Sequence, residues 1–442
     1  MRSQFEDNFL FGAATSAYQI EGATDADGRG PSIWDSFCAK QGTIVDRSNG
    51  DIACDHYNRL GADVHLMKEL GLSAYRFSIA WPRIQASGRG SANPKGLAFY
   101  DRLLDQLLAH GITPYATLYH WDLPLALGEK GGWENRDTAE LFADYAHCVS
   151  KHFGDRIANW ATFNEPRCAA FVGHLEGRHA PGLTSLKATL AAAHHMLVAH
   201  GLGIQAMRSN TKSKLGIVLD MKPYHPIDDD PANEIAARHG DTIFNHWFAD
   251  PLFGKGYPAD VVEAFGEAMP TIQDNDLKTI AQPIDSLGIN YYTRNLTRAN
   301  HKLPFPHAEE VKNPAARYSD MGWEVFPSGL TEILTRLHQR YNVPDYYIAE
   351  NGGAFPDKAN DHNFVNDADR IYYMEQHLQA VAKAKAQGVP VSAYMAWSLL
   401  DNFEWGLGYT KRFGIVRVDY QNQTRTPKAS AHWYRDFIHG KA

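Results

Sequence analysis

The feature that most constrains the fold is an alternation of short apolar runs with longer amphipathic segments, repeated from one end of the chain to the other. The apolar runs have the length of a strand and a near-continuous apolar character, which is typical of strands buried on both faces of a parallel sheet. Eight such units predict an α/β fold, a single (β/α)8 TIM barrel domain over residues 1–442, with its active-site loops at the carboxyl ends of the strands. The predicted strands span residues 9–15, 72–79, 112–119, 157–164, 215–220, 285–290, 345–350 and 391–397.

The segments between the strands show the three- and four-residue spacing of apolar side chains that marks an amphipathic helix. Residues 96–111 show this spacing clearly, and Gly111 stands where a helix commonly ends. The polar, proline-containing stretch at residues 300–320 is predicted to be a loop over one end of the barrel, not a domain boundary. The apolar positions predicted for the segment 96–111 are Leu97, Tyr100, Leu104, Leu107 and Leu108.

Charge and composition argue against several classes of partner. A net charge of −8 opposes binding to nucleic acid or to an anionic membrane. No apolar run has the length of a membrane-spanning helix, and the first twelve residues do not resemble a signal peptide. The cysteines form no CxxC pair, which predicts reduced thiols and a cytoplasmic protein. They are Cys38, Cys54, Cys148 and Cys168.

Polar and aromatic side chains stand where the predicted strands end. Barrel enzymes build their active sites at this end of the strands. Ordinary turn residues would vary among Ser, Asp, Lys and Gly, whereas this set consists mainly of amides, acids, an imidazole and aromatic rings. Such groups suit the binding of a polyol. The polar groups can hold its hydroxyl groups, and aromatic faces stack on sugar rings. The set comprises Gln19, Glu21, Arg76, His120, Trp121, Asn164, Glu165, Asn290, Tyr292, Glu350, Asn351, Trp397, Glu404 and Trp405.

Two acids in this set, Glu165 and Glu350, follow the fourth and seventh predicted strands. Only a closed barrel would bring them together, because they are far apart in the sequence. Cleavage of a glycosidic bond needs two such carboxyl groups: one protonates the leaving oxygen, and the other meets the developing oxocarbenium carbon.

Seven segments, in order along nearly the whole chain, resemble glycoside hydrolase family 1, the β-glucosidases and their relatives. The segment FLFGAATSAYQIEGA resembles the N-terminal signature of that family, TFNEP its acid/base motif and IAENG its nucleophile motif. The other four matching segments are YRFSIAWPRI, LYHWDLP, GINYYTR and WSLLDNFEW.

The resemblance implies a retaining mechanism with two displacements and no metal or cofactor. Glu350 attacks the anomeric carbon, while Glu165 protonates the leaving oxygen and later takes a proton from water. Arg76 and Tyr292 are the implied partners of Glu350, and an adjacent cation predicts a lowered pKa for that carboxyl. Burial and a second negative charge predict a raised pKa for Glu165. Retention predicts carboxyl groups about 5–5.5 Å apart, with Asn164 directed at the sugar 2-hydroxyl.

The resemblance also implies which residues hold the terminal sugar, with Trp397 as the platform beneath the ring. Glu404 favours a neutral hexose, because the phospho-β-glycosidases lack this acid. Arg167 stands where many members of the family have Trp, and we hypothesise that it favours a polar leaving group such as a second glucose. Trp323, His179 and Phe413 are further candidates for the walls of the site. The residues implied to bind sugar hydroxyls are Gln19, His120, Trp121, Asn290, Glu404 and Trp405.

The predicted function is hydrolysis of terminal non-reducing β-D-glucosyl residues from neutral β-glucosides and cello-oligosaccharides. Preference for glucose over galactose or fucose stays open, as does assembly into a homo-oligomer. The alternatives are a catalytically silent sugar-binding homologue, a 6-phospho-β-glycosidase and a metal-dependent barrel lyase or aldolase. The last would need a ligand cluster or a Schiff-base lysine at a strand end, and the sequence indicates neither. His194 and His195 lie in a helical segment and are predicted to be core or helix-surface residues.

Overall fold

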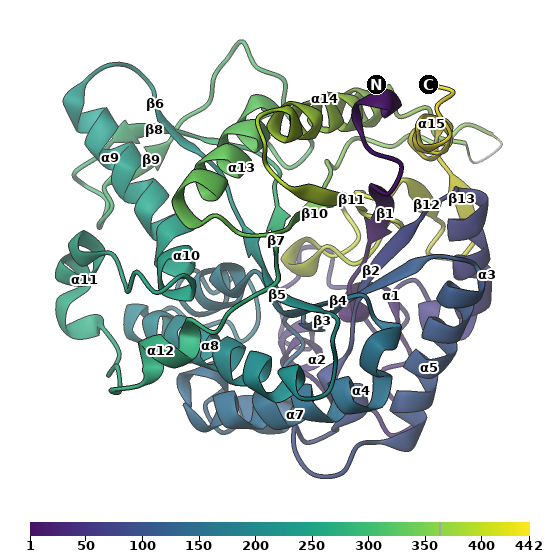
Figure 1. Cartoon of the computed structure of the whole chain (residues 1–442), viewed down its shortest axis with the longest axis horizontal. Coiled ribbons are helices and arrows are strands. Elements are labelled where there is room, and N and C mark those ends of the chain that lie inside the picture. Colours follow the sequence, from purple (N-terminus) through teal and green to yellow (C-terminus); the bar gives the residue numbers. More distant parts are fainter. Residues whose placement is uncertain (362–363) are drawn as a thin grey trace.

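The computed structural model describes residues 1–361 and 364–442, and it confirms the predicted barrel (Figure 1). Eight parallel strands form a closed sheet in the order β1-β11-β10-β7-β5-β4-β3-β2. Each of the eight apolar runs coincides with one of these strands, although β5 begins one residue before its run and β10 ends one residue after its run, and the side chains of the strands are almost all buried. The strands are β1 (Leu10–Ala14), β2 (Ala74–Ser78), β3 (Thr113–Tyr119), β4 (Asn159–Asn164), β5 (Lys214–Asp220), β7 (Ser286–Asn290), β10 (Tyr346–Asn351) and β11 (Val391–Trp397).

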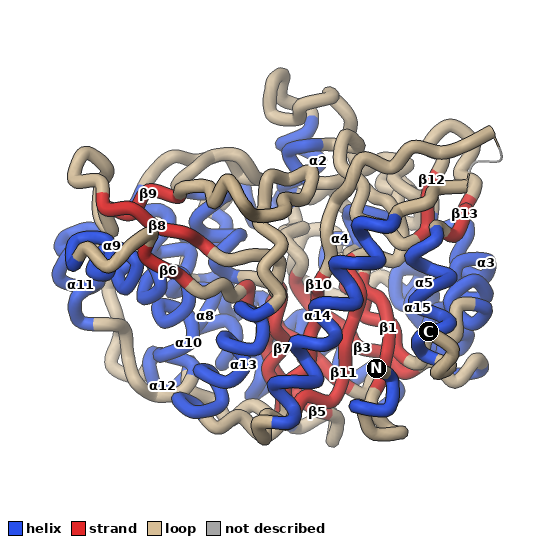
Figure 2. The backbone as a smooth tube through the Cα atoms, turned by 90° about the horizontal axis from the view of Figure 1, so that it is seen from above, coloured by secondary structure: helices blue, strands red, loops and turns tan. Residues whose placement is uncertain are grey.

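Helices surround the barrel, as Figures 1 and 2 show. The longer ones are α3 (His56–Glu69), α5 (Pro94–Ala109), α7 (Asp137–Phe153), α8 (Leu186–Arg208), α9 (Pro231–Asp241), α13 (Ser328–Tyr341), α14 (Ala368–Ala386) and α15 (Ala429–Ile438). Shorter helices are α1 (Ala17–Ile20), α2 (Ile33–Cys38), α4 (Trp81–Ile84), α6 (Leu125–Gly128), α10 (Trp247–Leu252), α11 (Ala259–Phe265) and α12 (Asp276–Ile280). No helix in the described part of the chain is both long enough and apolar enough to cross a membrane.

Helix α5 illustrates how local sequence fixes an element. The Asn93 side chain accepts a hydrogen bond from the first turn, and Pro94 occupies the first helical position, where its missing N–H costs nothing. Gly111 follows the helix with a φ of +71°, as the sequence predicts. Leu107 is fully buried, but Leu108 is 45% exposed. The prediction that Leu108 belongs to the apolar face is therefore wrong. Each residue of a helix is rotated by about 100° from the one before it, so Leu108 lies outside the buried stripe that contains Leu107.

Two small sheets are added to the barrel. One consists of β6 (Tyr224–Pro226), β8 (Asn295–Ala299) and β9 (Ala308–Glu310), and lies to one side of the barrel in Figure 2. The prediction of a plain loop for residues 300–320 is thus wrong at β9, which pairs antiparallel with β8 through its backbone. Its short polar sequence gives no strand signal. Backbone pairing holds it there, together with a hydrogen bond from the Asn295 amide to Glu310 at 3.0 Å. The second small sheet pairs β12 (Val416–Val418) with β13 (Arg425–Pro427).

The barrel interior is a packed apolar core that ends beneath the functional cavity. Small residues alternate with large ones there, which is how inward-facing side chains fill a barrel of eight strands. Trp397 and Phe413 belong to the same cluster and join the barrel interior to the cavity above it. Other members of this cluster are Ala14, Ala74, Tyr115, Ala161, Val218, Tyr347 and Met395.

Candidate active site

A cavity of about 850 Å³ lies at the carboxyl ends of the barrel strands. Most of the side chains that the sequence singled out meet in its wall, although they come from segments far apart in the chain. The predicted residues that line it are His120, Trp121, Glu165, Arg167, His179, Asn290, Tyr292, Trp323, Glu350, Trp397, Glu404, Trp405 and Phe413.

Three predicted site residues lie outside this lining and are buried. The Arg76 guanidinium donates to Asn164 and to Glu350, and Glu350 lines the cavity. Arg76 and Asn164 therefore influence the cavity through side chains that line it. The Gln19 side-chain amide donates hydrogen bonds to Asn402 and to the carbonyl oxygen of Phe403. Its implied contact with a sugar hydroxyl therefore stays a prediction.

Glu350, at the end of β10, is held by a cation and a phenol. Arg76 Nη1 donates to one carboxylate oxygen at 2.7 Å, and the Tyr292 hydroxyl donates to the other at 2.5 Å. Burial nevertheless raises the pKa of Glu350 above its ordinary value, although Arg76 and Tyr292 oppose that shift. The predicted lowering is wrong, because loss of hydration at a carboxyl that is only 3% exposed outweighs both partners.

Glu165, directly after β4, has a different setting. The Asn290 side-chain amide donates to its carboxylate at 2.5 Å, and this carboxyl is 5% exposed. Burial, then the negative charge of Asp220, then that of Glu350 raise the pKa of Glu165 well above its usual range. The predicted direction is confirmed. The contribution of Asp220 was not predicted.

The backbone at the site is strained at three residues that the sequence predicted to be functional. Glu165, Trp121 and Trp405 have φ values of 46°, 80° and 45°, in the left-handed region that side chains disfavour. Such conformations cost about 1–3 kcal/mol each and cluster at functional sites. Here the strain aims one acid and two indoles into the cavity.

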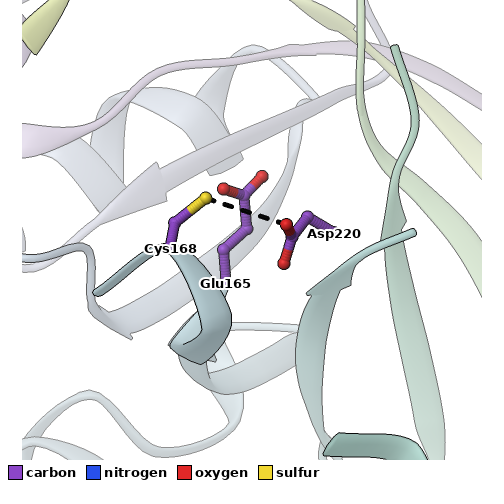
Figure 3. Close-up of side chains that lie close together, drawn as sticks. All are labelled: Glu165, Cys168 and Asp220. Atoms are coloured by element: carbon purple, nitrogen blue, oxygen red, sulfur yellow. Dashed lines mark hydrogen bonds between the residues drawn. The ribbon is translucent and has the colours of Figure 1, made fainter. Parts of the chain in front are cut away.

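Asp220 is a cavity residue beside Glu165 that sequence reasoning missed. It is the last residue of β5, and its carboxylate lies beside Glu165 and Cys168, as Figure 3 shows. One ligand atom from each of the three residues lies within 4.8 Å of the others. The only signal in the sequence was the position of Asp220 at the end of the run 215–220, the same kind of position that Glu165 and Glu350 occupy.

This group of three provides the kinds of atom that bind metals, and the sequence predicted no such cluster at a strand end. However, Arg167 Nε donates to Asp220 Oδ2 at 2.6 Å, and the thiol of Cys168 lies 3.7 Å from the same oxygen. A cation would have to displace the positive charge that is already there. We therefore assign Asp220 and Arg167 as an ion pair beside the acid Glu165, and we do not assign a metal centre here.

Aromatic rings form the remaining walls. His120 stacks on Trp397 and Trp405 at centroid distances of 5.9 and 6.0 Å, and Trp121 lies 4.6 Å from Trp405. On another part of the lining, Trp323 contacts Tyr292 and Phe413. Flat apolar faces surrounded by hydrogen-bonding groups can take up a sugar ring.

Glu404 is a half-buried acid of the cavity with an unused acceptor. Burial, and secondarily the charge of Glu350, raises its pKa to about 8. Its Oε2 atom has no hydrogen-bond partner among the described residues.

Several other conspicuous residues are structural. Glu21 pairs with buried Arg83 at 3.0 Å. His194 hydrogen-bonds to Asp276, and His195 to the carbonyl oxygen of Trp133, which confirms that both are core histidines. Asn351 donates to the backbone of Tyr291 and does not line the cavity.

A closed α/β barrel with two buried carboxyl groups in one aromatic-lined cavity at its strand ends defines a glycoside hydrolase. The chain belongs to glycosyl hydrolase family 1, a family of retaining glycosidases, whose sequence model matches residues 1–442. The family that the motifs indicated is thus confirmed.

Relatives resemble the chain along its full length. It is 47% identical to a β-glucosidase of Agrobacterium sp., over 100% of this chain and 96% of that protein. It is 43% identical to β-glucosidase A of Thermotoga maritima, with 98% of each covered. Among solved structures, a family 1 β-glucosidase from Thermotoga maritima matches with a TM-score of 0.96 at 42% identity, over 99% of this chain and 98% of that one. The virulence factor SghA from Agrobacterium tumefaciens matches with a TM-score of 0.97 at 46% identity, with the same coverage.

Proposed function

We propose that the protein is a retaining β-glucosidase that removes terminal non-reducing β-D-glucosyl residues, with Glu350 as nucleophile and Glu165 as acid/base. The observation that carries this assignment is the unequal setting of the two carboxyl groups. Arg76 and Tyr292 favour the ionised form of Glu350, whereas Asp220 and Glu350 disfavour ionisation of Glu165.

In the first step, a Glu350 oxygen forms a bond to the anomeric carbon as the bond to the leaving oxygen breaks. Glu165 gives its proton to that oxygen, and the leaving group departs as an alcohol. The arginine and the phenol hold the attacking carboxylate in place, so that little reorganisation is needed during the displacement.

In the second step, water attacks the anomeric carbon and the ester bond to Glu350 breaks. Glu165 takes the proton from water, and the sugar leaves with its original β configuration. Esterification removes the charge of Glu350, which makes Glu165 easier to ionise at the stage where it acts as a base.

A neutral hexose fits the part of the cavity that Glu404, His120 and Trp397 line. The vacant Oε2 acceptor of Glu404 suits a sugar hydroxyl, and His120 and Trp397 offer a stacked aromatic surface. Lys411 is not among the residues that line the cavity and is paired with the Asp320 carboxylate at 2.9 Å, which argues against its use in a site for a 6-phosphate. Together with the implied contacts of Gln19, Trp121, Asn290 and Trp405, this favours glucosides over 6-phosphoglucosides.

The leaving-group side of the cavity is polar where many relatives have an indole. Arg167 lies in the cavity wall with its guanidinium 3.9 Å from the centroid of Phe244. We infer that it favours a hydroxylated leaving group such as a second glucose, with Trp323, His179 and Phe413 as additional walls.

We also infer that the natural substrates include cello-oligosaccharides from cellulose degradation, cleaved in the cytoplasm by a chain that acts as one catalytic domain. The four free cysteines and the match of the family along residues 1–442 support this setting.

A panel of 4-nitrophenyl glycosides, assayed with and without EDTA, tests the proposed function. We expect rapid release of nitrophenol from the β-glucoside and no effect of the chelator. Absence of turnover on every glycoside would favour the sugar-binding alternative, and loss of activity with EDTA would favour a metal-dependent enzyme. Turnover of the 6-phosphoglucoside alone would favour a 6-phospho-β-glycosidase.

A further inference from the structure

We propose that the ion pair of Asp220 and Arg167 sets how tightly Glu165 holds its proton, and so determines the upper pH limit of catalysis. This inference rests on the proposed role of Glu165 as acid/base. Asp220 acts through Glu165, so it is a positioning residue and takes no part in bond making or breaking.

The barrel places Asp220 where it can act. Strands β4 and β5 are neighbours, and the Glu165 backbone N–H donates to the carbonyl oxygen of Val218 at 2.9 Å. Asp220 lies two residues beyond Val218, so both side chains point to the same face of the sheet. Since Val218 belongs to the interior apolar core, Asp220 points into the space above that core and lines the cavity.

The two carboxyl groups are close enough to interact strongly. A carboxylate oxygen of Asp220 lies within 4.8 Å of one from Glu165 (Figure 3). Both side chains are largely removed from water, where charges are poorly screened. Consistent with this geometry, Asp220 raises the pKa of Glu165 more than Glu350 does.

Arg167 provides the opposing charge. It follows Glu165 by two residues, donates to Asp220 at 2.6 Å and packs on the ring of Phe244. The guanidinium therefore offsets part of the field of the Asp220 carboxylate at Glu165. Removing either member of the pair should shift the proton affinity of Glu165, but in opposite directions.

Other charged and titratable groups face Glu165 from the surrounding elements. Glu350 lies on β10, Cys168 begins the π-helical segment Cys168–Val172 after β4, and Tyr292 follows β7. Arg76 on β2 is linked through Asn164, which shares the Asn290 amide with Glu165. Lys222 follows β5 and Glu404 follows β11, and both line the same cavity. Among the carboxyl groups near Glu165, Glu350 becomes a neutral ester during the reaction, whereas Asp220 forms no bond in either step.

The test is the pH dependence of kcat/KM for cellobiose, whose alcohol leaving group needs protonation. The basic limb reports ionisation of the acid in the free enzyme. Asp220→Asn should move this limb to lower pH by about one unit, the scale expected for loss of a close like charge. Arg167→Met should move it to higher pH, and the double variant should fall between the two. Asp220→Glu retains the charge and should restore the limb toward its original position.

The matched control is Asp250→Asn. Asp250 is also a buried carboxylate paired with an arginine, Arg340 at 2.7 Å, but it lies outside the cavity on α10. This variant should leave the basic limb unchanged, which separates the proposed effect from general loss of stability. The acid limb, which reports Glu350, should stay in place in all these variants.

The proposal is overturned if Asp220→Asn and Arg167→Met leave the basic limb in place or move it in the same direction. Glu165→Gln separates this failure from failure of the proposed function. If Glu165→Gln abolishes cellobiose hydrolysis while the Asp220 and Arg167 variants leave the limb unmoved, only this inference is wrong. If Glu165→Gln retains full activity, the proposed acid/base role is wrong.

Discussion

The two sides of the cavity carry the same functional group in different surroundings. On one side, Glu350 is bonded to the guanidinium of Arg76 and the hydroxyl of Tyr292. On the other, Glu165 has an amide, Asn290, and a second carboxylate, Asp220, as its neighbours. Glu165 directly follows β4 and Glu350 lies at the end of β10, and both are at least 95% buried.

Burial raises the proton affinity of both groups, so burial alone cannot assign different roles to them. The neighbours contributed by other strands establish which carboxyl group holds its proton more tightly. A cation on β2 favours the charged form of Glu350, and an anion on β5 favours the protonated form of Glu165. The division of labour is therefore a property of the barrel and not of the two short motifs.

Removal of Glu350 should have the largest effect. We expect Glu350→Gly to lower kcat for glucosides by at least about 10⁴-fold, because the carboxylate that Arg76 and Tyr292 hold for attack is removed. Added azide should restore turnover by entering the vacated space and should give the α-glycosyl azide, identifiable by NMR. A β-glycosyl azide from this variant would contradict the assignment of Glu350 as the group that attacks the anomeric carbon.

Removal of the acid on the other side should depend on the leaving group. Glu165→Gln should lower kcat/KM for cellobiose by about 10²–10⁴-fold, because an alkoxide cannot depart without a proton. For 2,4-dinitrophenyl β-glucoside, whose phenolate leaves unaided, kcat/KM should change little. Equal losses on both substrates would show that Glu165 does not act as the acid.

Arg76→Met should shift the acid limb of kcat/KM to higher pH. Arg76 lowers the pKa of Glu350, so its loss leaves the nucleophile protonated over a wider range. Activity near neutral pH should fall about 10–100-fold, and unfolding should become easier by about 3–5 kcal/mol, as for a broken buried ion pair.

The matched control for that prediction is Arg83→Met. Arg83 pairs with Glu21 at 3.0 Å and is as buried as Arg76, but it lies outside the cavity lining. A comparable loss of stability is expected in a melting experiment, with the acid limb unchanged. A shifted limb in the Arg83 variant would mean that stability, and not charge at the nucleophile, controls the pH profile.

The smallest effect is expected from Arg167→Trp, on the leaving-group side. We expect the ratio of kcat/KM for cellobiose to that for octyl β-glucoside to fall by about tenfold or less, because the indole favours an apolar leaving group. An unchanged ratio would reject the role of Arg167 in leaving-group preference.

The sequence was sufficient to predict the eight strands and the two acids. Apolar runs such as residues 345–350 are long enough to be recognised as strands, and the motifs around Glu165 and Glu350 mark their ends. Strand β9 was missed because its pairing with β8 and the hydrogen bond of its Glu310 to Asn295 are tertiary contacts that a short polar sequence does not reveal.

The electrostatics could be predicted only in part. The raised pKa of Glu165 followed from the presence of a second acid, but Asp220 as its neighbour depends on the pairing of β4 with β5. For Glu350 the sequence indicated a cationic partner, whereas the cost of burying the carboxylate is a tertiary property that no motif contains.

A direct test follows the carboxyl carbons of Glu165 and Glu350 by ¹³C NMR across pH, with Gln variants to assign the signals. The same titration is repeated after the nucleophile is trapped as its 2-deoxy-2-fluoroglucosyl ester. Glu165 should keep its proton to higher pH than Glu350 in the free enzyme, and should release it at lower pH once the ester has formed. Titration of Glu350 above Glu165, or no change at Glu165 on trapping, would contradict the account.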